Sequence, residues 1–183
     1  ILNLVYLAEY FGLGEVAKFW EEIVNINNWH QKRIAKIVVQ KLFGTISQKK
    51  IVILGFAFKA NTNDTRESPS IEICKNLLEE GAKISVYDPK VEGNQILSVL
   101  KNIYLGEDIN QKVSLDDSVL QASTEADAIL ILTDWDEFKI IDWKEIFKVV
   151  KKPIWIFDTR NLSLNRDYLQ KIGFNFWRLG STN

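Results

Sequence analysis

The chain has 183 residues, of which 46% are hydrophobic and 26% are charged, and its formal net charge is −1. This composition is typical of a globular protein with one ordinary domain and some additional structure. Lys and Arg are spread along the chain and every apolar run is far too short to span a bilayer, so we expect neither a nucleic-acid partner nor a membrane partner.

The start of the chain and its single cysteine carry information about its origin. One cysteine, Cys74, excludes an internal disulfide and fits a reducing compartment, and no secretory signal opens the sequence. We therefore expect a cytoplasmic protein. The sequence begins at Ile1 and contains no Met. Because a translated product begins with Met, we expect this chain to be a fragment whose start lies upstream.

Two segments at the beginning of the chain show helical periodicity. Apolar residues recur at a spacing of three or four from Leu2 to Phe11 and again through residues 15–43, with glycines between the two segments. At about 1.5 Å per residue, the second helix would extend on the order of 40 Å. A helix of that length seldom packs on one small domain alone and more often links domains or packs against a partner. We therefore expect self-association, as a dimer or a larger assembly, through residues 15–43.

From Lys50 onward the pattern changes to alternating strands and helices. Residues 51–54 form a continuous apolar run, which is typical of a strand buried on both faces of a parallel sheet. In chain order we then expect a helix at 68–80, a strand at 83–87, a helix at 91–100, a polar stretch at 106–112, a short helix at 118–123, a strand at 128–132, a helix at 142–149, a strand at 154–157, a short helix at 167–172 and a strand at 173–179. This alternation predicts an α/β fold with a Rossmann-like, doubly wound parallel sheet.

The loop after the first strand is the candidate ligand site, because ligands of such sheets bind outside the carboxyl ends of the strands. Gly55 allows a tight turn, and Lys59 and Arg66 supply positive charge. Residues 68–70, Ser-Pro-Ser, are expected to begin the next helix and to direct free N–H groups toward the loop. Of the G-x-G-x-x-G pattern only Gly55 is present, so the pattern alone supports a phosphate site and a structural turn equally.

Two further residues at strand ends have two interpretations each. Asp88 lies where dinucleotide-binding domains place a ribose-binding acid, but without the glycine pattern a turn-forming Asp-Pro is the favoured interpretation. Arg160 either binds an anion or pairs with Asp158, and the sequence leaves both open. Trp135 is the one tryptophan that could line a pocket, and the others are expected in the core or at interfaces.

Several motifs occur in an order that identifies a family. They are I-L-G-F-A-F-K at 53–59, T-x-D-x-R-E-S-P-S at 62–70, V-Y-D-P at 86–89, T-D-W-D-E-F at 133–138, I-F-D-x-R at 156–160 and the opening residues 1–7. Together they resemble the C-terminal part of the UDP-glucose/GDP-mannose dehydrogenase family, closest to its UDP-glucose branch. The resemblance covers the entire chain, and its first motif is highly specific.

The resemblance implies a reaction and a set of binding residues. The family oxidises UDP-glucose to UDP-glucuronate with two NAD⁺, through a thiohemiacetal and then a thioester on a cysteine thiolate. It implies that Phe58, Lys59 and Arg160 contact the UDP-sugar and that Arg66 reaches toward NAD across a domain cleft. Lys and Arg suit a diphosphate because they offset its charge, and Arg can donate two parallel hydrogen bonds.

By the same resemblance, residues 1–47 correspond to a central helical dimerisation region and residues 48–183 to the UDP-sugar-binding domain. The sequence contains neither G-x-G-x-x-G for NAD nor the glycine-rich segment with the nucleophilic cysteine, so we expect no dehydrogenase activity from this chain alone. Cys74 is expected to be a buried small side chain, and His30 a surface or interface group.

Three alternatives remain open at this point. The first is the same chemistry on another nucleotide sugar, such as a UDP-N-acetylhexosamine or GDP-mannose. The second is a non-catalytic nucleotide-sugar-binding or regulatory module. The third is a dimerisation scaffold in which the long helix is the functional element.

Overall fold

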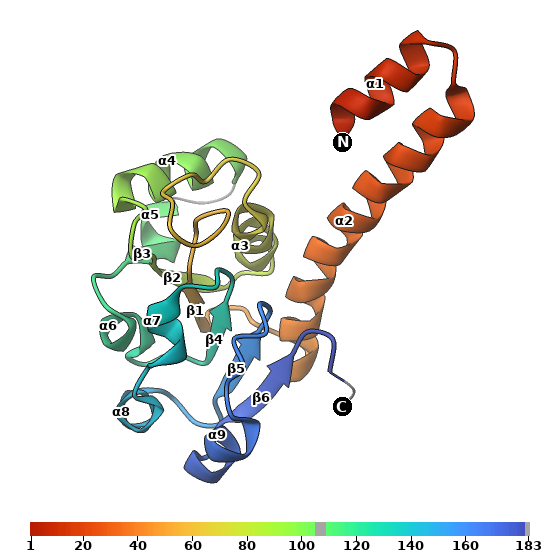
Figure 1. Cartoon of the computed structure of the whole chain (residues 1–183). Helices are drawn as coiled ribbons and strands as arrows, with labels where there is room; N and C mark the ends of the chain where they lie inside the picture. Colours follow the sequence, from red (N-terminus) through yellow and green to blue (C-terminus); the bar gives the residue numbers. More distant parts are fainter. Residues whose placement is uncertain (105–108, 182–183) are drawn as a thin grey trace.

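The structure is a computed structural model that describes residues 1–104 and 109–181. Its strands are β1 (Lys50–Leu54), β2 (Lys83–Tyr87), β3 (Val113–Leu115), β4 (Ala128–Ile131), β5 (Trp155–Asp158) and β6 (Asn175–Arg178). They form one six-stranded sheet in the order β3-β2-β1-β4-β5-β6, in which every neighbouring pair is parallel (Figure 1). The predicted Rossmann-like α/β fold is confirmed. The strand order reverses between β1 and β4, and such a switch point opens a crevice at the carboxyl ends.

Helices cover both faces of this sheet. They are α1 (Leu2–Tyr10), α2 (Gly14–Lys41), α3 (Pro69–Glu79), α4 (Gly93–Ile103), α5 (Ile109–Lys112), α6 (Val119–Ser123), α7 (Asp136–Lys139), α8 (Trp143–Val149) and α9 (Arg166–Ile172). Helix α3 contacts α2 and α4, whereas α8 contacts α6 and α9. None of the helices in the described part of the chain has the length and apolar character needed to cross a membrane.

Local sequence signals explain where the helices begin and end. Ser68 caps α3 by accepting a hydrogen bond from the Ser70 N–H at 3.3 Å, and Pro69 occupies the first helical position, as expected from the sequence. Asn165 caps α9 in the same way, through the Tyr168 N–H at 3.0 Å. These side chains satisfy N–H groups that a helix start otherwise leaves without partners.

The core forms around the two central strands. Residues 51–54 of β1 and all of β4 are buried, as expected for strands covered on both faces. Leu54 pairs with Tyr87 of β2 on one side and with Ile131 of β4 on the other. The carboxyl ends of these three strands therefore lie side by side, and the loops that follow them meet.

Helix α2 has two different surroundings along its length. Its second half belongs to the core of the sheet domain through Ile34, Ala35 and Val38, whereas α1 and the first half of α2 form a hairpin that projects away from the sheet (Figure 1). The predicted long helix is confirmed: it begins one residue before the expected range of 15–43 and ends two residues short of it. The division of the chain at residue 47 remains a proposal.

Three short elements, β3, α5 and α7, have no counterpart among the elements expected from the sequence. Strand β3 has only three residues, Val113–Leu115, too few for an alternating pattern, and it is recognisable only through its pairing with β2. Helices α5 and α7 have four residues each and were also not predicted. The expected polar stretch at 106–112 lies partly outside the described residues, and from Ile109 its described part is helical.

Candidate functional site

The candidate site begins where the chain turns sharply off β1. Gly55 has a φ of +92°, and its N–H donates to the carbonyl of Tyr87 at 2.8 Å. A Cβ at this position would lie 2.4 Å from the Cβ and 2.8 Å from the backbone N of Thr133. The first loop therefore passes directly against the end of β4, which requires glycine for both conformation and space.

The N–H groups of this loop are taken by a carboxylate of the protein itself. Asp88, at the end of β2, accepts through Oδ2 from the N–H groups of Phe56 (2.7 Å) and Ala57 (3.0 Å) and from Nε1 of Trp135 (3.2 Å). Its Oδ1 accepts from two N–H groups further along its own turn, at 2.9 and 3.0 Å. The structure thus gives Asp88 the turn-forming role that the sequence favoured, and it buries Trp135 rather than exposing it in an open pocket.

The carbonyl groups of the same loop are also fixed. Hydroxyl groups of Ser68, Ser70 and Thr133 donate to the three consecutive carbonyls of residues 55–57, at distances from 2.8 to 3.2 Å. All three hydroxyl-bearing residues are buried. The N–H group of Ser70, which the sequence predicted to be free for a ligand, is bound to the Ser68 hydroxyl. Side-chain hydrogen bonds from α3 and β4 therefore hold this segment in one conformation.

This arrangement does not fit a dinucleotide in the crevice. In dinucleotide-binding domains the loop after the first strand brings glycine backbone close to a pyrophosphate. Here Ala57 and Ala60 stand where the second and third glycines of that pattern would be. The Asp88 carboxylate, an internal anion, occupies the N–H groups of residues 56 and 57. The implied cofactor NAD therefore has no fitting phosphate site on this loop.

Beyond the fixed segment, the structure brings three of the expected site residues together. The side chains of Phe58 and Lys59 are exposed, that of Phe58 by 45%. Nη2 of Arg160, in the loop after β5, donates to the carbonyl of Phe58 at 3.2 Å. In the described part of the chain, Lys59 takes part in no ion pair. Two cationic side chains and an exposed aromatic ring thus lie at the carboxyl ends of β1 and β5.

The buried carboxylate of Asp158 pairs with Arg178 rather than with the Arg160 side chain. The Asp158 carboxylate accepts from the main-chain N–H of Arg160 at 3.1 Å and of Leu162, and it forms an ion pair with Nε of Arg178 at 3.2 Å. Asp158 is fully buried, so this pair anchors the loop. The guanidinium of Arg160 consequently keeps its charge uncompensated by this carboxylate, and of the two interpretations the geometry favours an anion-binding side chain.

Arg66 has a different environment in the same first loop. Its side chain is 87% exposed and donates from Nε and Nη2 to both carboxylate oxygens of Asp64, at 2.9 and 2.7 Å. These hydrogen bonds from the guanidinium lower the pKa of Asp64 to about 2 and raise that of Arg66. Arg66 is therefore presented at the surface, on a loop closed by a hydrogen bond from the Phe58 N–H to the Asp64 carbonyl.

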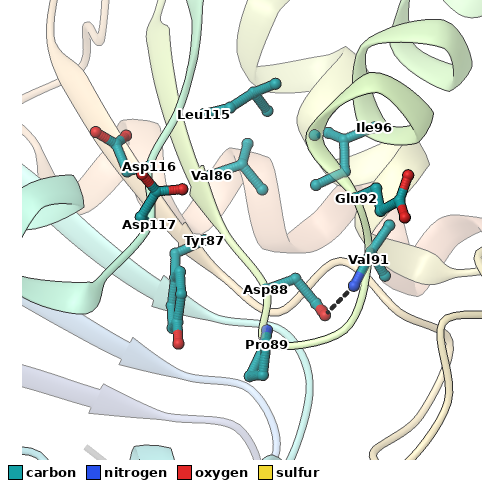
Figure 2. Close-up of a pocket in the computed structure, with 11 residues that line it drawn as sticks. Val86, Tyr87, Asp88, Pro89, Val91, Glu92, Ile96, Leu115, Asp116 and Asp117 are labelled. Carbon is teal, nitrogen blue, oxygen red and sulfur yellow. Dashed lines mark hydrogen bonds between the residues drawn. The ribbon is translucent and has the colours of Figure 1, made fainter.

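A cavity of about 320 Å³ lies at the carboxyl ends of β2 and β3 (Figure 2). Four carboxylates line it, from Asp88, Glu92, Asp116 and Asp117. Asp116 also accepts hydrogen bonds from the hydroxyls of residues 85 and 114. Like charges repel, so this acidic lining disfavours a diphosphate. This cavity is therefore a poorer candidate for a phosphate site than the loops that carry Lys59 and Arg160.

The two remaining side chains considered for chemistry are those of Cys74 and His30. Cys74 is fully buried, and desolvation raises the pKa of its thiol, so the reactive thiolate is disfavoured. His30 is half-buried and stacks on Trp29, with ring centroids 6.1 Å apart. Neither residue has the surroundings of a nucleophile or of a general base.

Sequence comparisons match this chain to proteins of one family. The model of the UDP-glucose/GDP-mannose dehydrogenase family, UDP binding domain, matches residues 52–164. The UDP-glucose 6-dehydrogenase of Caenorhabditis elegans is 42% identical over 182 residues, covering 100% of this chain and 38% of that protein. The enzyme of the same name from Gallus gallus is 43% identical over 183 residues, covering 98% of this chain and 37% of that protein. The chain thus spans less than half the length of these relatives.

Solved structures show the same fold at lower identity. An NDP-N-acetyl-D-galactosaminuronic acid dehydrogenase from Methanosarcina mazei has a TM-score of 0.68 at 22% identity, covering 90% of this chain and 31% of that one. A UDP-glucose dehydrogenase from Pyrobaculum islandicum has a TM-score of 0.66 at 21% identity, covering 95% and 36%.

Proposed function

This chain belongs to the UDP-glucose/GDP-mannose dehydrogenase family, and we propose that its α/β domain binds the UDP-sugar in an NAD-dependent UDP-glucose 6-dehydrogenase. The observation that carries the proposal is the guanidinium of Arg160, fixed to the Phe58 carbonyl at 3.2 Å and left without Asp158, which pairs with Arg178. The 41–43% identity to proteins named UDP-glucose 6-dehydrogenase supports UDP-glucose over other nucleotide sugars.

The residues of this site suit a diphosphate and a flat or apolar ligand surface. Arg160 can donate two parallel hydrogen bonds to phosphate oxygens, and Lys59 adds a second positive charge. Phe58, exposed on the same loop, can pack against the sugar or the base. Hydrogen bonds fix the main chain at residues 55–57, directly before Phe58 and Lys59, which reduces the backbone ordering that binding would otherwise require.

We further propose that the whole protein oxidises UDP-glucose to UDP-glucuronate and that this chain contributes substrate binding rather than the reacting groups. The buried Cys74 thiol is a poor nucleophile, and the Asp88 carboxylate blocks the dinucleotide loop. The nucleophilic cysteine and the NAD site would then lie in the part of such proteins that this chain does not cover. Arg66, exposed at the surface, would contact NAD from outside its own domain.

Removing the two cations should weaken the binding of UDP-glucose measured by isothermal titration calorimetry. We expect Arg160→Ala to raise Kd by about 10- to 150-fold, because a charge-assisted hydrogen bond contributes roughly 1.5–3 kcal/mol. Lys59→Ala should raise it about 3- to 10-fold, because Lys59 is more exposed to screening solvent. Arg160→Lys keeps the charge but should recover only part of the affinity, since it loses the planar fork.

Arg66→Ala is the matched control, because it also removes one positive charge from the first loop. If Arg66 serves NAD, its loss should change the Kd of UDP-glucose by less than about twofold. If Arg160→Ala, Lys59→Ala and Arg66→Ala raised the Kd of UDP-glucose equally, the effect would reflect the net charge of the surface and would contradict the proposed site. If GDP-mannose or a UDP-N-acetylhexosamine bound as tightly as UDP-glucose in competition titrations, the chain would be assigned to another branch of the family.

We propose self-association through the α1–α2 hairpin as a second property. This hairpin exposes a series of large apolar side chains on its projecting part, namely Leu2, Tyr6, Tyr10, Phe11, Phe19 and Ile26. Large exposed apolar side chains concentrated on one projecting segment are typical of an interface. Residues 1–47 would accordingly act as the dimerisation region.

Light scattering on the purified chain tests this property. We expect a mass of at least twice 21.1 kDa for the wild type and a shift toward 21.1 kDa for the double variant Phe19→Glu, Ile26→Glu. Ile140→Glu is the control, because Ile140 is 83% exposed but lies outside the hairpin. A wild-type mass of 21.1 kDa at all concentrations, or equal dissociation by the control, would rule out this interface.

A further inference from the structure

A second, smaller cavity joins the long helix to the loop that carries Arg160. Its volume is about 160 Å³, and it lies between α2, the start of α3 and the segments that follow β5 and β6. Helix α2 contributes the polar side chains of Asn27, His30 and Gln31, and the loop after β5 contributes Thr159 and Arg160. The rest of the lining is apolar.

The polar groups of this cavity are suited to an anion. Among the described residues that line it none is acidic, and Arg160 carries a formal positive charge. Nε of Arg160 is buried and has no hydrogen-bond partner in the described part of the chain, whereas Nη2 is bound to Phe58. A buried donor without an acceptor costs free energy, and a guanidinium nitrogen can only donate. An oxygen ligand in this cavity would satisfy it.

The size of the cavity limits the ligand to a small group. At about 30 Å³ for each water molecule in the liquid, 160 Å³ has room for about five water-sized atoms. That matches one phosphorus with its oxygens and is far below the roughly 300–1,000 Å³ of sites that enclose whole ligands. A nucleotide sugar can therefore place only an anionic fragment here.

We propose that this cavity is a phosphoryl subsite in which His30 and Gln31 of α2 bind the anion together with Arg160. The inference rests on the proposed function in so far as the phosphoryl group belongs to a nucleotide sugar; a free inorganic phosphate would have the same chemistry. The imidazole and the amide are both able to donate hydrogen bonds to phosphate oxygens. Helix α2 then serves two purposes, because the same helix carries the apolar surface of the hairpin.

The test compares anion binding by variants that keep the size of the side chains. Inorganic phosphate and UDP-glucose are each titrated into the full chain by calorimetry, in a buffer free of other oxyanions. The variant is His30→Phe with Gln31→Leu, which removes both polar groups and keeps a ring able to stack on Trp29. Asn25→Leu is the control, because Asn25 lies on the same helix but its amide bonds to Glu22 instead. Circular dichroism and the thermal midpoint verify that each variant folds.

We expect the double variant to raise the Kd of both inorganic phosphate and UDP-glucose by about tenfold or more. The control should raise either Kd by less than about twofold. Competition between phosphate and UDP-glucose in the wild type would assign the cavity to the diphosphate, and simultaneous binding would assign it to free phosphate. If the wild type binds UDP-glucose and the folded double variant binds it equally well, the subsite is overturned while the proposed function stands. If the wild type binds phosphate through these residues but not UDP-glucose, the proposed function fails instead. No binding of either ligand overturns both.

Discussion

Replacing Gly55 with alanine is expected to lower the free energy of unfolding by about 2–6 kcal/mol, measured by urea denaturation. Two costs combine. The φ of +92° forces a side chain into a conformation that L-residues rarely adopt, at about 1–3 kcal/mol. The new Cβ would also lie 2.4 Å from the Cβ and 2.8 Å from the backbone N of Thr133, so β4 or the loop must move, at about another 1–3 kcal/mol.

Gly44→Ala separates these two costs. Gly44 has a similar φ of +82°, but nothing lies within 4 Å of the position that its Cβ would occupy. Its substitution should therefore show only the conformational cost, about 1–3 kcal/mol. The excess for Gly55 measures the contact with β4. Equal losses at both positions would mean that the crevice tolerates a side chain and that the close approach of loop and strand is unimportant.

Much of this fold could be predicted from the sequence because its signals are local. The continuous apolar run at residues 51–54 indicated a strand buried on both faces, and the Ser-Pro start and the glycine at 81 bounded α3. Strand β3 could not be found in this way. Its three residues, Val113–Leu115, gain their strand conformation from pairing with β2, a partner about thirty residues earlier, and no local pattern reports such pairing.

The candidate site shows the same division between local and long-range information. Lys59 and Arg160 were expected at strand ends from the sequence, and the family resemblance implied that they contact the UDP-sugar. The sequence did not predict that Asp158 would form its ion pair with Arg178 rather than Arg160, because that pairing depends on β6 lying beside β5. Nor did it reveal the buried hydroxyls that hold the carbonyls of residues 55–57, since serine and threonine near a loop are common and carry no directional signal.

His30 illustrates how tertiary structure can change the interpretation of a single residue. By sequence it was a lone histidine on a long helix, with no partner to suggest chemistry. In the structure the second half of α2 packs on the sheet domain, and this packing places His30 in the same cavity as Arg160. A helix for which the sequence predicted self-association thereby also lines a cavity of the candidate site.

Asp88→Asn is expected to destabilise the protein by about 3–5 kcal/mol, although the two side chains have nearly the same shape. The carboxylate accepts hydrogen bonds from five N–H groups, four of them on the main chain. An amide offers a single oxygen, and its NH₂ would face donors where an acceptor is needed. The N–H groups of Phe56 and Ala57 would lose their partner, and the segment that presents Phe58 and Lys59 would loosen. The affinity of the folded fraction for UDP-glucose should therefore fall as well.

Asp117→Asn is the matched control for this prediction, because Asp117 lines the same acidic cavity but its side chain is exposed. It should change the free energy of unfolding by less than about 0.5 kcal/mol. A ribose-binding role for Asp88 leads to the opposite pattern: the substitution would leave stability almost unchanged and would weaken a nucleotide ligand only. Measuring stability and ligand affinity on the same variant thus separates an internal anion that shapes the loop from an acid kept for a cofactor.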